Sequence, residues 1–282
     1  MGERYEGATV SMAVGAEYRK DTIDAASDPL SQTAGWFAVN PKPLSGDVNV
    51  KEGYAEVVVP LLRDKPAAYS LDVNGAGRLT DYSTSGQVTA WKAGINYSPL
   101  ADLRFRATVS RDIRAPSINE LYSAETQQVT ALVDPRNNSN PTVTQLIAGN
   151  PALEPETSKA YTVGLVFQPG WVRGLRMSVD YYSFDITNAI ASLNGQQFLD
   201  GCFTLGQQAL CSAIVQNASG VITRINGTLL NAAATKSSGI DAELGYDLPI
   251  GAGKMDFRLL GTYVDELATT ISGRSVDIVD QI

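Results

Sequence analysis

Side chains in nine segments of this sequence alternate between apolar and polar with a period of two residues. In residues 103–110, for example, the odd-numbered side chains are Leu, Phe, Ala and Val, and the even-numbered ones are Arg, Thr or Ser. A period of two places successive side chains on opposite faces of a β-strand. The sequence therefore predicts an all-β protein built from two-faced strands.

The other eight alternating segments are 10–18, 55–61, 69–73, 91–97, 161–167, 175–181, 240–248 and 255–261. With their flanks, most of the nine can reach about nine residues or more, whereas strands of ordinary globular proteins contain about five or six. A strand that crosses a bilayer at a tilt needs about 9 to 11 residues. Strand length therefore favours a transmembrane β-sheet.

The connections between these segments alternate in length. Short ones are 63–66, 98–101, 169–174 and 249–253, and they separate longer ones at 20–50, 80–86, 113–156 and 188–235. This order is typical of an antiparallel up-and-down meander with unequal ends, such as an outer-membrane barrel with short turns on one side and long loops on the other. We expect 113–156 and 188–235 to be long irregular loops.

Charges of both signs lie on the polar side of the alternation. They are Arg104, Arg106, Arg176, Asp180, Asp241, Glu243, Asp256 and Arg258. In a barrel this face would line a wide wet lumen, and in a soluble sheet it would face solvent. Aromatic residues near the short turns, namely Tyr69, Tyr97, Phe167, Trp171 and Tyr246, indicate an interfacial girdle, although aromatics are common in any strand.

Composition excludes several functions. The chain has 282 residues and no histidine, which removes Ser-His-Asp and Cys-His catalysis and the commonest zinc ligand. Its net charge of −8 argues against nucleic acid as a partner. The sequence contains no run of 18 apolar residues, so it predicts no membrane-spanning helix. The first residues do not have the pattern of a signal peptide. We predict no enzyme activity, catalytic residue, metal site or cofactor.

The two cysteines, Cys202 and Cys211, are separated by eight residues within the connection 188–235. This spacing suits a local disulfide that stiffens a loop in an oxidising compartment. Free thiols are the alternative.

Four short motifs occur in a fixed order. Arg114-Ala115-Pro116 ends an alternating segment where proline fits a strand exit. Next come Glu120-Leu121, then a return segment, and finally Gly239-Ile240-Asp241. The return segment contains Gly149, Asn150, Pro151, Glu154, Pro155 and Glu156. Together the four motifs resemble the barrel of TonB-dependent outer-membrane receptors, with Ile113 standing where an aromatic residue is usual.

The resemblance implies a barrel of about 22 strands with a plugged lumen. It also implies outer-membrane localisation, contact with outer-membrane lipid, and uptake of a scarce siderophore, cobalamin or oligosaccharide. Energy would come from the TonB complex, which grips a segment ahead of the plug. This sequence shows neither that segment nor a plug, and nine strands are too few to close such a barrel. We therefore expect residues 1–282 to form one partial barrel domain, with Ser275–Ile282 opening a further loop.

Two other functions remain open. An outer-membrane barrel enzyme would satisfy the strand pattern, although such enzymes commonly depend on histidine. A soluble all-β carbohydrate-binding module would satisfy the alternation, but it would bury its apolar face against a second layer and dissolve without detergent.

Overall fold

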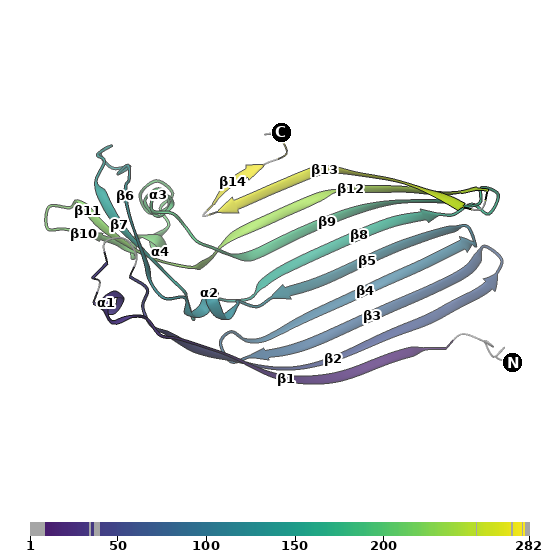
Figure 1. Cartoon of the computed structure of the whole chain (residues 1–282), viewed down its shortest axis with the longest axis horizontal. Helices are drawn as coiled ribbons and strands as arrows, with labels where there is room; N and C mark the ends of the chain where they lie inside the picture. The colour runs from purple at the N-terminus through teal and green to yellow at the C-terminus, as the bar shows by residue number, and fades with distance from the viewer. Residues whose placement is uncertain are drawn as a thin grey trace.

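A curved antiparallel sheet of ten strands forms most of the computed structural model (Figure 1). The structure describes residues 9–33, 35–36, 40–251, 253–271, 273–277 and 279. The sheet order follows the chain: β1 (Ser11–Ala25), β2 (Leu44–Lys65), β3 (Ala68–Tyr82), β4 (Gly86–Leu100), β5 (Leu103–Arg114), β8 (Glu156–Phe167), β9 (Leu175–Ala191), β12 (Leu230–Ile250), β13 (Gly253–Ile271) and β14 (Arg274–Asp277). No described helix is long and apolar enough to cross a membrane.

All nine strands expected from the alternation are present, and each is longer than its alternating segment. Strand β12 begins ten residues before Ile240, for example. Most of the added length lies at the end of the sheet opposite the short turns (Figure 1). The connection expected at 80–86 consequently shrinks to residues 83–85. The segment expected to open a loop at Ser275 instead contributes to β14, which pairs with β13, and 278 and 280–282 lie outside the described residues.

The register aligns the alternation across the sheet. One row of register partners is apolar or aromatic throughout: Val59, Val73, Ile95, Ala107, Val163, Tyr181, Ile240 and Tyr263. The neighbouring row on the opposite face is Asp72, Asn96, Arg106, Gly164, Asp180, Asp241 and Thr262. We call the two sides the apolar face and the polar face.

The apolar face is open rather than covered by a second layer. Val163 is 58% exposed and Leu259 is 68% exposed, values that a sandwich core would not show. The structure corrects the expected place of Leu61 in the alternation of β2. A register shift between Pro60 and Leu62 puts Leu62, and not Leu61, opposite Leu71. A bulge of this kind adds a residue to one strand and so ends its simple alternation.

The expectation that 113–156 and 188–235 are irregular is wrong. They contain β6 (Thr126–Ala131), β7 (Thr142–Ala148), β10 (Ile214–Gln216) and β11 (Ile222–Thr228), which form a four-stranded sheet in the order β10-β11-β7-β6. Strands β11 and β7 pair in parallel and so join the two connections. The chain also forms α1 (Pro29–Gln32), α2 (Ile118–Tyr122), α3 (Gly195–Leu199), the π-helix η1 (Asp200–Thr204) and α4 (Gln208–Cys211).

The largest buried core lies in this region and not in the ten-stranded sheet. Residues 126–148 and 192–229, which we call the lobe, enclose Leu132, Val143, Leu193, Phe198, Leu199, Leu210, Ile222 and Ile225. Figure 1 shows the lobe at the end of the sheet away from the short turns. A smaller cluster of Val48, Val50, Leu121 and Leu153 packs nearby. The lobe is thus a packed body carried on the strand ends.

Candidate functional site

Arg114 is the centre of an ion-pair network where β5 leaves the sheet. Its Nε donates to Glu156 Oε2 at 2.7 Å, and its Nη1 donates to Glu120 Oε2 at 2.9 Å. Glu156 Oε1 also accepts from the backbone N–H of Ile190 at 2.8 Å. Three side chains therefore connect the end of β5, helix α2, the start of β8 and the end of β9.

Helix α2 begins in a geometry that explains why Glu120 faces Arg114. Ser117 and Glu120 form a capping box, in which Glu120 N–H donates to Ser117 Oγ and Ser117 N–H donates to the Glu120 carboxylate. Burial alone raises the pKa of Glu120, but the hydrogen bonds from Arg114 and Ser117 bring that pKa below its usual value. Glu120 is therefore held as the anion that Arg114 requires.

The return segment packs against the exit segment through its backbone. Asn150 N–H donates to Glu120 O at 2.9 Å, and its side-chain Nδ2 donates to Leu229 O at 2.9 Å. A Cβ on Gly149 would lie 2.5 Å from Ser123 N, so only glycine fits this close approach. Leu121 is 1% exposed and packs in the same cluster as Leu153. Pro116 and Pro155 are buried, Ala115 is half-buried, and Pro151 and Glu154 are exposed.

Asn231 makes contacts that the sequence did not reveal. Its Nδ2 donates to Glu154 O at 2.8 Å and to Asn188 O at 2.7 Å, and its Oδ1 accepts from Glu154 N–H at 2.9 Å. It therefore ties the start of β12 to the return segment and to β9. An asparagine inside a predicted loop carries no sequence signal of this role, because its partners are backbone groups brought close only by folding.

Gly239 and Asp241 lie on the polar face of β12, apart from the Arg114 network. A Cβ on Gly239 would lie 2.3 Å from Tyr263 O and 2.7 Å from Tyr182 Oη. Asp241 Oδ1 accepts from Thr262 Oγ1 at 2.7 Å. These two motif residues therefore fix how β12 meets β13 and β9, and the structure does not bring them to the other motifs.

Ion pairs link separate strands on the polar face. Arg106 Nε donates to Asp180 Oδ1 at 2.7 Å across β8, where Gly164 leaves room for both side chains. Arg176 Nη1 pairs with Asp247 at 2.6 Å, and Arg258 Nε pairs with Glu243 at 2.7 Å. Gly164, which lies between Arg106 and Asp180, marks this ion pair in the sequence, but the search for a period of two residues did not identify it. The polar face therefore carries paired charges of both signs.

The lobe is held together by polar contacts and by one covalent bond. Cys202 and Cys211 form a disulfide that joins η1 to α4. Arg136 pairs with the buried Asp134 at 2.7 Å, donates to Gly220 O at 3.0 Å, and stacks over Phe203 at 4.6 Å from the ring centroid. Arg136 thus joins the β6–β7 hairpin to the second long connection.

Removing the disulfide should loosen the lobe without unfolding the ten-stranded sheet. Cys202→Ser together with Cys211→Ser should lower lobe stability by about 2 kcal/mol, since the closed loop is short. Hydrogen exchange of residues 192–229 should rise, and exchange of β3 and β4 should not. Ser219→Ala, in the same loop region, is the control, and unchanged exchange in the double variant would contradict the expectation.

Acid should weaken the lobe through Asp134. The Arg136 hydrogen bond is the main cause that lowers the pKa of Asp134. The stabilisation is therefore present above the unfolded value of about 4 and is lost as pH falls through the lower folded value. The unfolding temperature of the lobe should fall more between pH 7 and pH 3 in the parent than in Asp134→Asn. An equal fall in both proteins would show that Asp134 does not cause the acid sensitivity.

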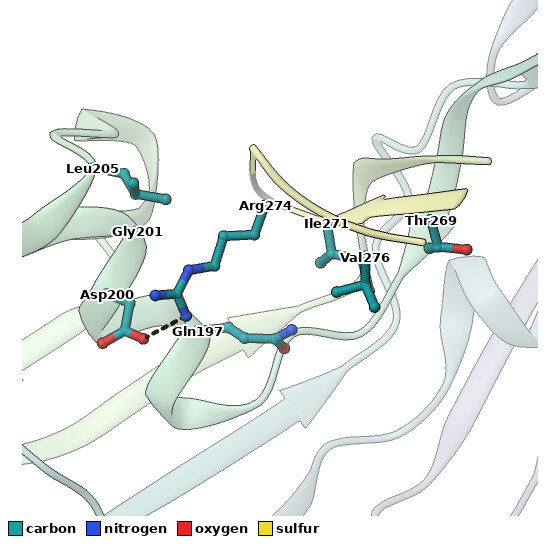
Figure 2. Close-up of a pocket in the computed structure, with 8 residues that line it drawn as sticks. All are labelled: Gln197, Asp200, Gly201, Leu205, Thr269, Ile271, Arg274 and Val276. Carbon is teal, nitrogen blue, oxygen red and sulfur yellow. Dashed lines mark hydrogen bonds and ion pairs between the residues drawn. The ribbon is translucent and has the colours of Figure 1, made fainter. Parts of the chain in front are cut away.

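A pocket of about 270 Å³ lies between the lobe and the β13–β14 hairpin (Figure 2). Arg274 Nη1 faces Asp200 Oδ2 at 3.5 Å, beside the Gln197 amide. Leu205, Ile271 and Val276 supply apolar wall. The pocket therefore offers both signs of charge and an apolar surface. In the described residues, no group of three or more acidic or cysteine side chains is placed to hold a metal ion.

The sequence matches the family model described as TonB dependent receptor-like, beta-barrel, over residues 3–279. The chain belongs to the TonB-dependent receptor family. This membership agrees with the open, two-faced sheet and with the order of the four motifs. A comparison with curated proteins finds no match.

Solved structures show the same fold as this TonB-dependent receptor chain at low identity. The siderophore receptor PirA from Acinetobacter baumannii has 16% identity and a TM-score of 0.62, covering 94% of this chain and 35% of that one. A mutant ferric enterobactin receptor from Pseudomonas aeruginosa in complex with enterobactin has 18% identity and a TM-score of 0.59, covering 93% and 34%. The RagAB peptide importer has 15% identity and a TM-score of 0.51, covering 96% and 29%. The chain thus spans about a third of the length of these structures.

Proposed function

We propose that this chain forms part of the wall and the extracellular mouth of an outer-membrane receptor that takes up a scarce solute through TonB. Family membership supports a receptor or transporter, and the open apolar face supports contact with lipid. The single observation that carries the proposal is this face, on which large side chains such as Leu259 are 68% exposed in register across the sheet. Such a surface requires a hydrocarbon partner.

In this proposal the motif residues act structurally. Arg114, Glu120 and Glu156 hold the strand exits from which the lobe extends, and the lobe presents the pocket at Arg274 to incoming solute. The charged polar face lines the lumen. The protein is accordingly not an enzyme, and its partners are outer-membrane lipid, the TonB complex and the solute.

The solute class is proposed as siderophore, cobalamin or oligosaccharide. One of the solved structures is named as a siderophore receptor, one as a ferric enterobactin receptor and one as a peptide importer, so the fold accommodates several solutes. Siderophores are the first class to test.

The test is uptake by cells that carry or lack the gene. Deletion should abolish energy-dependent uptake of one solute from a panel of ferric siderophores, cobalamin and oligosaccharides. The same loss should follow when TonB is deleted. Uptake that persists without TonB, or a protein that fractionates as soluble, would overturn the proposal.

A further inference from the structure

The apolar face ends, toward the lobe, in a row of charged side chains. Arg111, Lys159, Asp185 and Lys236 are successive register partners on β5, β8, β9 and β12. Each has the same parity as the apolar residues in the alternating segment of its strand, since Arg111 follows Val109 by two positions and Lys159 precedes Tyr161 by two. The row therefore lies on the apolar face, directly beyond its apolar band.

These cations lack the carboxylate partners that arginines on the polar face have. Arg78, Arg106, Arg176 and Arg258 each pair with an acidic side chain. Among the described residues, Lys159 and Lys236 have no hydrogen-bond or ion-pair partner. Arg111 donates only to the backbone and side chain of Thr89. The row thus carries three cations and one anion with most of its hydrogen-bonding capacity unused.

Aromatic residues mark the depth of this row. Trp91 is the register partner of Arg111 and is 45% exposed, and Tyr161 is 52% exposed. From Tyr161 to Phe167 the strand runs roughly 20 Å at about 3.3 Å per residue, which a tilt of about 40° reduces to roughly 15 Å across the membrane, within the apolar band of about 25 Å in outer-membrane barrels. Aromatic belts sit at the level of lipid headgroups, so the cations lie at that level too.

We propose that Arg111, Lys159 and Lys236 bind the phosphates of an anionic lipid in the leaflet that faces the lobe. Beside hydrocarbon an unpaired cation is costly, whereas a phosphate offers charge-assisted hydrogen bonds. The row extends over three strand spacings, about 14 Å, which suits a headgroup that carries two phosphates. This inference rests on the membrane placement proposed above.

The test uses the protein expressed from its full reading frame and reconstituted in phosphatidylethanolamine vesicles. The probe is diphosphoryl lipid A, compared with monophosphoryl lipid A. Combined Arg111→Gln, Lys159→Gln and Lys236→Gln should weaken diphosphoryl lipid A binding about 100-fold, at about fivefold per cation. Asp185→Asn should tighten binding about fivefold by removing the only anion of the row.

The matched control removes three cations elsewhere, by Lys92→Gln, Arg104→Gln and Arg173→Gln, and should change binding less than twofold. Equal binding by the triple variant and its parent would overturn the lipid site. Displacement of the lipid by millimolar inorganic phosphate would also overturn it, because the site would then be one for free phosphate. Fractionation separates the two proposals. A soluble protein overturns both, whereas an inserted protein with no preference for phosphorylated lipid overturns only this one.

Discussion

Replacing Gly239 by alanine should lower the free energy of unfolding by about 3 kcal/mol. The new Cβ would lie 2.3 Å from the carbonyl oxygen of Tyr263 on β13, a contact that a backbone held by ladder hydrogen bonds cannot easily relieve. The two strands must separate locally, at the position where the register already shifts after Ser238. Urea unfolding in detergent micelles, followed by intrinsic fluorescence, measures the change.

Gly261→Ala is the matched control for this prediction. Gly261 lies on β13, and nothing lies within 4 Å of the position that an added Cβ would take there, so its effect should be small. Tyr182→Phe removes the second close group, the hydroxyl at 2.7 Å, and should not rescue Gly239→Ala. A full rescue would show that Tyr182, and not the backbone of β13, makes the glycine necessary.

Replacing Arg114 by alanine should cost about 2 kcal/mol and should release the base of the lobe. The substitution leaves two carboxylates, Glu120 and Glu156, close together without their shared cation. Glu156 is the more buried, with a side chain only 14% exposed, so its uncompensated charge dominates the cost. Hydrogen exchange should rise in helix α2 and at the start of β8.

Arg104→Ala is the control for the Arg114 variant, because Arg104 lies on the same strand and has no ion-pair partner among the described residues. Arg114→Lys should recover only part of the loss, since an ammonium cannot make the paired contacts of a guanidinium. If Arg114→Ala and Arg104→Ala had equal effects, the network would not anchor the strand exits.

The two predictions address different parts of the molecule. The Gly239 prediction tests how closely β12 and β13 pair in the ten-stranded sheet. The Arg114 prediction tests how the lobe is attached to the strand ends. Defects in the wall should reduce the amount of protein inserted in the membrane. Under the proposed function, defects at Arg114 should leave insertion intact and impair solute capture, because the pocket at Arg274 depends on the position of the lobe.

Sequence alone determined nine of the ten strands of the large sheet, all except β14. Alternation is a local property, and a strand with one face in hydrocarbon must repeat it residue by residue, so the nine long strands and their two faces were readable. The motif residues Arg114, Glu120 and Glu156 were also identified in sequence. The contact of Arg114 with Glu156 was not, because these two residues are 42 positions apart along the chain.

Only the tertiary structure decided the lobe, the shared register and the charge row on the apolar face. Strands β7 and β11 are short and pair in parallel across about eighty residues of chain, and so small a segment has too few residues to display a period. Arg111, Lys159 and Lys236 look like scattered surface charges until the register of four strands places them side by side. Long-range pairing sets these features, and it is a property of the folded sheet rather than of any one segment.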